Sequence, residues 1–393
     1  MAFVPSLLSL SAAFAAAPAQ FTSVTVDPHV GIGYGLALSD VDGDHRVDIL
    51  LVDKDVVAWY HNPGWEKHVL AEKLTAIDHV CIAARDVDGD GKCEVAVGAG
   101  WNPSDTVGSG SVHFLSAPAD RTQRWQPVEL PHEPTVHRMR WVKDGAGRLD
   151  LVVSPLHGRG NKNGEGAGIR LLLYRRPPAG KDPWTTELID GDLHVTHNLE
   201  PINWDADPED EILLAAKEGV FLLDRAGGAW KRIRLGGNGP GETAFQGASE
   251  VRTGRLEGGR RFIATVEPFH GNKVVIYTPP AEGAAADALW KRFEIDDSLA
   301  EGHAVAVGDI LGAGSDQLLV GWRKKDAAGK VGIRLYVPSA DGKTWSRAAF
   351  DDNEMACEDI ALADLDGDGG LEVVAAGRDS HNLKVYSRAR AAK

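Results

Sequence analysis

The chain alternates short apolar segments with turns rich in Gly, Asp and Asn. One recurring segment places a tryptophan before alternating polar and apolar residues, at Trp65, Trp125, Trp184, Trp230, Trp290 and Trp345. Another is an apolar strand that runs into a polar turn, ending near Asp40, Asp86, Asp144, Asn203, Asp309 and Asp364, with a weaker copy around Arg255. Further strands lie between these segments, so each unit contains about four short antiparallel strands. This pattern predicts an all-β protein made of propeller blades.

Counting the units predicts how the ring closes. Seven inner-strand units occur, but only six are followed by a tryptophan-led outer strand. The missing strand is found at the start of the chain, where Phe21-Thr-Ser-Val-Thr-Val has an aromatic residue at the tryptophan position. An N-terminal strand in the last blade would protect its sheet edge and hold both termini. We predict one seven-bladed propeller of four-stranded antiparallel blades over residues 20–393, with eight blades as the alternative.

Charge and the N-terminus limit the partners and the location. The 42 basic and 57 acidic residues give a net charge of −15, which disfavours nucleic acid as a partner. The apolar run Leu7 to Ala17 and the small residues before Gln20 fit a signal peptide over residues 1–19. No segment is suited to span a membrane. We therefore expect a secreted or periplasmic protein, with its three cysteines as small buried side chains.

Three acidic turns share one spacing, with carboxylates at positions one, three, five and nine. They are Asp40, Asp42, Asp44 and Asp48; Asp86, Asp88, Asp90 and Glu94; and Asp364, Asp366, Asp368 and Glu372. Alternating carboxylates on a curled loop supply the hard oxygen ligands that calcium requires. A solvated acidic turn is the alternative, but carboxylates this close repel one another without a cation. We predict about three structural Ca²⁺ sites; a fourth turn, residues 203–211, keeps oxygens at these positions, whereas those at Asp144 and Asp309 have lost ligands.

These turns carry a resemblance to a known family. The Asp-x-Asp-Gly-Asp-Gly-x-x-Asp/Glu spacing within an apolar hairpin is similar to the FG-GAP or VCBS repeat. The resemblance implies a calcium-binding propeller and leaves the function open.

Histidines recur at one point of the repeat. The start of the predicted inner strand carries His79, His137, His197, His303 or Glu358, with Tyr34 and Glu250 in the remaining units. The end of the second strand returns to the same rim and carries Trp101, His157, Glu267, His270, Trp322, Arg323 or Arg378. We predict that both sets line one rim of the central channel, opposite the acidic turns. A single histidine is usually a satisfied polar contact, but convergent titratable groups in a cleft favour a functional site.

The residue types suggest two kinds of ligand. Clustered imidazoles and carboxylates suit Zn²⁺ or another transition metal such as manganese or iron. Tryptophans beside arginine and histidine suit a small carbohydrate or glycan, although rim packing explains Trp101 and Trp322 equally well.

A narrower resemblance is carried by Val136–Trp141, Leu156-His157-Gly158 and Glu267–Asn272. These segments resemble the propeller of the aldos-2-ulose dehydratase/isomerase family. The resemblance implies metal-supported elimination on a keto-sugar, with metal and substrate groups on His137, His157, His197, His270 and His303.

Two classes of function follow. The first is a metal-dependent lyase or dehydratase acting on a carbohydrate that bears a carbonyl. Its assigned residues are His79, His137, His197 and His303 for metal, His270, His157 and Glu250 for catalysis, and Trp101, Trp322, Arg323, Arg378 and Glu358 for substrate. The second is a non-catalytic, lectin-like or adhesion propeller that uses the same rim to bind carbohydrate or protein. A glycosidase with paired carboxylates also stays open, because the sequence does not give their separation.

Overall fold

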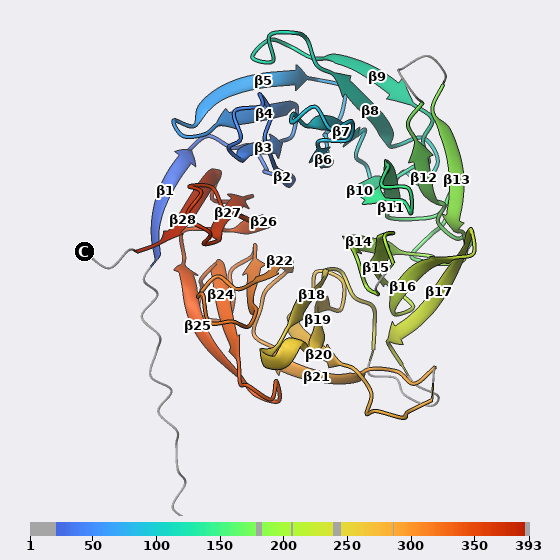
Figure 1. The fold of residues 1–393 in the computed structure, drawn as a ribbon, viewed down its shortest axis with the longest axis vertical. Helices are drawn as coiled ribbons and strands as arrows, with labels where there is room; N and C mark the ends of the chain where they lie inside the picture. The colour runs from blue at the N-terminus through green and yellow to red at the C-terminus, as the bar shows by residue number, and fades with distance from the viewer. Residues whose placement is uncertain (1–20, 178–182, 206, 239–244, 286, 390–393) are drawn as a thin grey trace, which may run out of the picture.

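A computed structural model describes residues 21–177, 183–205, 207–238, 245–285 and 287–389. It contains seven four-stranded antiparallel sheets arranged as blades around a central channel (Figure 1). The innermost strand of each blade contacts the innermost strands of both neighbouring blades, so the ring is closed. The predicted seven-bladed, all-β architecture is confirmed. The proposed signal peptide, residues 1–19, lies outside the described residues.

The blades follow one another along the chain, and each is built from the channel outwards. Blade 1 contains β2 (Gly35–Ser39), β3 (Asp48–Val52), β4 (Val56–His61) and β5 (Glu66–Glu72). Blade 2 contains β6 (Cys81–Arg85), β7 (Glu94–Ala99), β8 (Ser111–Ser116) and β9 (Gln126–Leu130). Blade 3 contains β10 (Val136–Lys143), β11 (Leu149–Pro155), β12 (Leu171–Arg175) and β13 (Thr185–Asp190). Blade 4 contains β14 (Thr196–Ile202), β15 (Glu211–Ala216), β16 (Val220–Ala226) and β17 (Ala229–Gly236).

The remaining blades repeat this order, with one short 3₁₀ helix in a turn. Blade 5 contains β18 (Val251–Arg255), the helix Glu257–Gly259, β19 (Arg261–Glu267), β20 (Lys273–Thr278) and β21 (Lys291–Asp296). Blade 6 contains β22 (Gly302–Gly308), β23 (Gln317–Trp322), β24 (Gly332–Pro338) and β25 (Trp345–Asp352). Blade 7 contains β26 (Cys357–Ala363), β27 (Glu372–Gly377), β28 (Asn382–Arg388) and β1 (Phe21–Asp27). In the described part of the chain, no helix has the length and apolar character needed to cross a membrane.

Burial follows the position of each strand within its blade. The second strands are continuous apolar runs and are buried throughout, as in β7 and β15. They lie between neighbouring blades on both faces, where apolar area removed from water stabilises the fold. Outer strands such as β17 keep mostly exposed or half-buried positions because one face meets solvent. The three cysteines are buried and free, as predicted.

Strand β1 closes the ring, as the chain-end pattern predicts. It pairs antiparallel with β28, from Phe21 opposite Arg388 to Asp27 opposite Leu383. The Phe21 ring lies 4.9 Å from the Phe350 ring of blade 6, so β1 also packs on the neighbouring blade. Asp27 accepts hydrogen bonds from Tyr60 and Lys67 of blade 1. The N-terminal strand therefore joins three blades.

Removing β1 should destabilise the whole ring. A chain that begins at residue 28 exposes the β28 edge and loses the Phe21 packing, so its free energy of unfolding should fall by at least about 3 kcal/mol. Chemical denaturation of this variant beside a chain that begins at residue 21 measures the effect. Equal unfolding midpoints for the two chains would contradict the closure.

Candidate functional site

Four predicted site residues lie at irregularities in the inner strands. The pairing register shifts at His137 in β10, at His197 in β14, at His303 in β22 and at Glu358 in β26. A β-bulge redirects a side chain and is frequent beside functional sites. The inner strands of blades 1, 2 and 5 pair without such a shift. The bulges thus distinguish blades 3, 4, 6 and 7.

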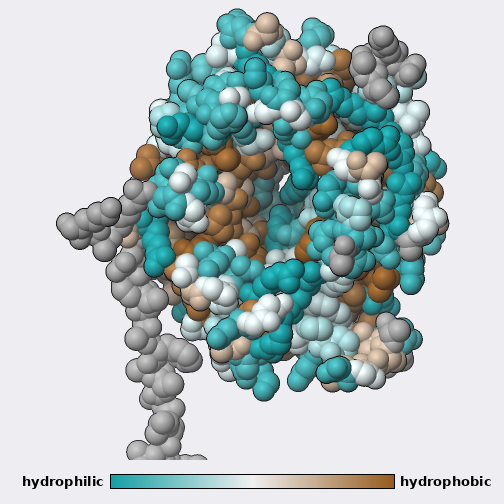
Figure 2. Space-filling model, viewed as in Figure 1, coloured by the Kyte–Doolittle hydropathy of each residue, from teal (hydrophilic) through white to brown (hydrophobic). Residues whose placement is uncertain are grey.

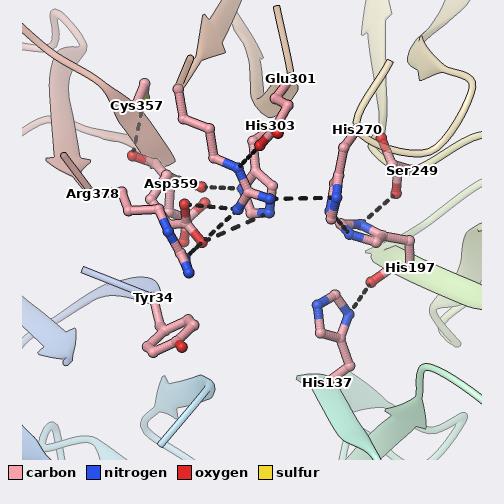
Figure 3. A network of polar contacts seen from close by, with 12 residues as sticks. Tyr34, His137, His197, Ser249, His270, Glu301, His303, Cys357, Asp359 and Arg378 are labelled. Carbon is pink, nitrogen blue, oxygen red and sulfur yellow. Dashed lines mark hydrogen bonds and ion pairs between the residues drawn. The ribbon is translucent and has the colours of Figure 1, made fainter. Parts of the chain in front are cut away.

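Three imidazoles meet at the start of these strands (Figure 3). The candidate ligand atoms of His197, His270 and His303 all lie within 4.8 Å of one another. The Nε2 atoms of His197 and His270 are 2.8 Å apart. The His303 ring centroid lies 4.9 Å from that of His270 and 5.6 Å from that of His197. This group is called the histidine cluster below.

Backbone carbonyls fix the orientation of two of these rings. His303 Nδ1 lies 2.6 Å from the Glu358 carbonyl oxygen, and His197 Nδ1 lies 3.1 Å from the Ser249 carbonyl oxygen. A carbonyl oxygen only accepts, so the proton of each ring is on Nδ1 and the lone pair is on Nε2. The lone pair of His197 faces His270 Nε2, a contact that a metal ion would have to replace. Metal-binding histidines usually donate their other N–H in this way.

Glu250 supports His197 at the Nδ1 edge of its ring. Its Oε1 lies 3.0 Å from His197 Nδ1, and its Oε2 accepts a hydrogen bond from Asn198. The carboxylate is 2% exposed. Burial raises its pKa, but the contact with His197 outweighs this and holds the pKa at about 2. Glu250 is therefore ionised and orients His197.

His270 comes from a different element, the turn after β19. Its backbone has a φ of 46°, in the left-handed region that non-glycine residues rarely adopt. Its Nδ1 lies 3.4 Å from Nη2 of Arg323. Burial, with the nearby His197 and Arg323, lowers the pKa of His270 to about 2. Strained backbone of this kind is found where a side chain is held in place for function.

An arginine connects His270 to two carboxylates. Arg323 donates through Nη1 to both oxygens of Glu358, at 3.1 and 3.0 Å, and through Nε to Glu301 at 3.0 Å. Arg378 also donates to Glu358, at 3.2 Å, and its guanidinium lies over the Tyr34 ring. These contacts make one continuous polar network on blades 1, 5, 6 and 7.

The imidazoles of the cluster are neutral. Burial lowers the pKa of His197 and holds that of His303 well below its usual range. The same is true of His137, where Arg138 adds to the effect of burial. Neutral imidazole is the form that binds a metal ion.

His137 borders the cluster but is arranged differently. Its ring lies 4.5 Å from that of His197 and 4.8 Å from that of Trp101. Its Nδ1 lies 2.9 Å from the His197 carbonyl oxygen, and its Nε2 lies 3.1 Å from Nη1 of Arg138. The Arg138 N–H occupies the lone pair that a metal would need. His137 therefore forms the wall of the site together with Trp101.

Several residues predicted for the rim are placed elsewhere. His79 Nε2 accepts a hydrogen bond from Leu74 N, within blade 2's own entry loop. Trp322 is 5% exposed, packs in the core of blades 5 and 6, and donates to Lys330 O. His157 forms an isolated β-bridge with Val195, and among the described residues its ring has no contact with the rings of the histidine cluster. Glu267 is held by Tyr277 and Arg292. The buried contacts of His79 and Trp322 contradict their predicted place on the shared rim, because register decides which way each side chain points. His157 and Glu267 lie outside the histidine cluster.

The acidic turns connect the inner and second strands in one shared conformation. In all three, the position-one carboxylate accepts from the N–H groups of positions four and six, and position nine accepts from position two. Candidate ligand atoms of Asp40, Asp42 and Asp48 lie within 4.8 Å of one another, as do those of Asp86, Asp88 and Asp90. Oxygen donors converging this closely fit calcium.

Two degenerate turns carry substitutions that lower or balance their negative charge. In blade 3, the guanidinium of Arg148 donates to Asp144 at 2.7 and 2.9 Å. In blade 6, the position-nine carboxylate is replaced by Gln317, which accepts from Leu311 N without adding charge. This contrast supports the fit of the three intact turns to a cation.

Comparisons with known proteins match part of the chain to one described propeller domain. A family model described as "Aldos-2-ulose dehydratase, beta-propeller domain" matches residues 109–280. Aldos-2-ulose dehydratase of Phanerodontia chrysosporium is 26% identical over 310 residues, 74% of this chain. The match covers 34% of that protein, so the chain spans about a third of the length of this relative.

Solved structures with similar folds include other propellers. The Cps50 (Swd1) propeller domain of Myceliophteria thermophila has a TM-score of 0.53 at 10% identity, with 93% of this chain and 99% of that chain covered. A chain of the mitotic checkpoint complex has 0.57 at 12%, covering 93% and 90%. The exotype rhamnogalacturonan lyase YesX has 0.54 at 13%, covering 95% and 76%. At these identities the likeness concerns the fold alone.

Proposed function

We propose that the protein is a metal-dependent lyase that dehydrates a carbohydrate bearing a carbonyl group. The observation that carries this proposal is the histidine cluster, in which His197 and His303 present Nε2 lone pairs beside His270. The similarity to the aldos-2-ulose dehydratase propeller favours a keto-sugar as the substrate class.

His197 and His303 would hold the metal, and His270 would lie beside it to move a proton. A zinc, manganese or iron ion would polarise the sugar carbonyl and acidify the adjacent C–H bond. Glu250 and the Glu358 carbonyl keep the two ligand rings in orientation.

His270 is the residue that we assign to proton transfer. Arg323 faces its Nδ1, which directs its Nε2 toward the reacting space beside His197. Because the Arg323 N–H faces Nδ1, the proton of His270 lies on Nε2; it would pass to the leaving hydroxyl, and the proton of the C–H bond next to the carbonyl would replace it on the ring. The C–H and C–O bonds break, a C=C bond forms and water leaves. Arg323 and Arg378 would bind the substrate's oxygens.

Turnover of a keto-sugar tests this proposal. The metal-loaded protein is incubated with an aldos-2-ulose, and the ultraviolet absorbance of the conjugated unsaturated product is followed. Wild type should form product, whereas His270→Ala should keep its metal and lose turnover. If wild type binds the sugar without forming product, the protein is a carbohydrate-binding propeller and the lyase proposal is wrong.

We also propose that the three intact acidic turns bind structural calcium. Chelation of calcium should lower the melting temperature, because calcium present at 100 times the Kd of a site contributes about 2.7 kcal/mol to the stability of the folded state. Scanning calorimetry with calcium and with chelator measures the difference. Glu372→Gln should reduce the calcium response, and Asp309→Asn in the degenerate turn should leave it unchanged. Identical melting curves with calcium and with chelator would contradict the sites.

A further inference from the structure

The channel contains a second polar region beyond the histidine cluster. A cavity of about 430 Å³ is lined by residues from the inner strands of all seven blades. None of the histidine cluster residues lines it. Its residues follow the cluster along the same strands, as Glu200 follows His197 by three positions, a distance of about 10 Å along a strand. The space-filling view shows the central hollow, with brown hydrophobic atoms along part of its wall (Figure 2).

The wall of this cavity combines apolar and charged side chains. The apolar part includes Leu36, Ile82 and Ile360, and the charged residues are Arg85, Arg140, Glu200, Arg252 and Asp359. Small-molecule sites typically combine an apolar lining with a small number of placed polar groups. Three guanidiniums against two carboxylates give the cavity an excess of positive charge.

The charged groups are anchored individually and not to one another. Arg140 and Arg252 each donate through Nη1 to a backbone carbonyl, at 2.8 and 2.7 Å. Glu200 accepts from Thr253 N at 2.8 Å, and Asp359 accepts from Leu36 N at 2.8 Å. No ion pair within 4.0 Å joins these charged residues in the described structure. Each guanidinium has five N–H donors, and the backbone contact of Arg140 and of Arg252 uses one of them.

Burial affects these groups because they lack close partners. It raises the pKa of Glu200 to about 7, against the opposing charge of Arg252. It also lowers the pKa of Arg140 to about 10, with Arg252 adding to the effect. Partly desolvated charges held apart around a cavity are typical of binding sites.

We propose that this cavity is a second ligand site, separate from the histidine cluster, and that it binds a small hydroxy acid. The carboxylate of the acid lies between Arg140 and Arg252, which bind carboxylates through paired N–H groups. Glu200 and Asp359 accept hydrogen bonds from its hydroxyl groups. The apolar wall contacts the carbon chain.

Calorimetric titration with D-gluconate, D-glucose and inorganic phosphate tests this site. Gluconate should bind and glucose, which lacks the carboxylate, should bind at least about tenfold more weakly. Arg140→Gln and Arg252→Gln should each weaken gluconate binding at least about tenfold. Arg255→Gln, an exposed arginine at the end of the same strand as Arg252, is the matched control and should leave it unchanged.

Further variants separate this site from its alternatives. Glu200→Gln should weaken gluconate and leave phosphate unaffected, and His303→Ala should leave gluconate binding intact. Arg252→Lys serves if the glutamine variant does not fold, and should also weaken binding because lysine has no paired donors. The proposal is overturned if gluconate does not bind, if the arginine variants bind it normally, or if His303→Ala abolishes binding. The proposal is also overturned if phosphate binds as tightly as gluconate and Glu200→Gln does not change gluconate binding, because the cavity would then be a simple anion site.

Discussion

Replacing His303 by alanine should lower the affinity for a transition metal by at least about 100-fold and abolish turnover. Loss of a hydrogen-bond partner of a metal ligand already costs 10- to 100-fold, so loss of the ligand itself should cost at least as much. His303 provides the Nε2 lone pair that the Glu358 carbonyl orients, and its ring is buried among the other imidazoles. No other imidazole among the described residues is placed to replace it. Metal titration of the purified variant measures the loss.

His113 provides a matched control for His303. It is also buried, at 6% exposed, but lies in β8 against Ser111, away from the cluster. His113→Ala should retain the metal affinity of wild type, and His303→Gln preserves side-chain bulk if the alanine variant is unstable. A His303→Ala protein that folds and binds metal like wild type would remove His303 from the site.

Replacing Arg323 by methionine should have the second large effect. This change leaves Glu358, 2% exposed, with Arg378 and the His303 ring, whose Nε2 lies 3.8 Å from Glu358 Oε1. It also removes the group that faces His270 Nδ1. Removing one partner of a buried ion pair typically costs about 3 kcal/mol, so stability should fall by about that amount. Turnover should fall 10- to 100-fold, because the orientation of His270 depends on Arg323.

Two companion variants separate positioning from charge. Arg323→Lys keeps the charge but cannot reach Glu301, Glu358 and His270 together, so its turnover should remain low. Lys324→Met removes the adjacent cation, which pairs with Asp379 at the surface, and should leave both stability and kcat unchanged. If Lys324→Met and Arg323→Met lower kcat equally, the loss is not due to the contacts of Arg323. Steady-state kinetics and chemical denaturation provide both readouts.

The fold could be predicted because its information is repeated along the chain. Each tryptophan-led segment marks the outer strand of a blade, and each acidic turn marks the connection between the first and second strands. Phe21 takes the tryptophan position in the strand that completes the last blade. The hydrophobic pattern therefore fixed both the number of blades and the closure by β1. The turns could be placed between first and second strands for the same reason.

The candidate site could be predicted only in part. His197, His303 and Glu358 were predicted because they occupy equivalent positions at the start of the inner strands. His270 and Arg323 were predicted because they follow or end the second strand, which returns to the same rim. The sequence did not contain the bulges that turn these side chains into the channel, since a one-residue shift of register is invisible to a hydrophobic pattern. The same limitation led to the misplacement of His79 and Trp322.

Arg138 was missed as a site residue, although it follows His137 directly in the sequence. Its guanidinium donates to His137 Nε2, a contact that depends on the side chain folding back on its own strand. The signal in the sequence was an arginine that directly follows the histidine at the start of an inner strand. Likewise, Glu200 and Asp359 lie in blades 4 and 7, far apart in the sequence, and only the closed ring brings them to one cavity.

The most direct test of the central claim is the transition-metal content of the wild-type protein after dialysis against excess calcium. Elemental analysis should find about one zinc, manganese or iron ion per chain, because calcium does not compete with these ions for nitrogen ligands. The calcium at the acidic turns is counted separately in the same sample. A protein that contains only calcium after loading with each of these metals would contradict a metal-dependent lyase.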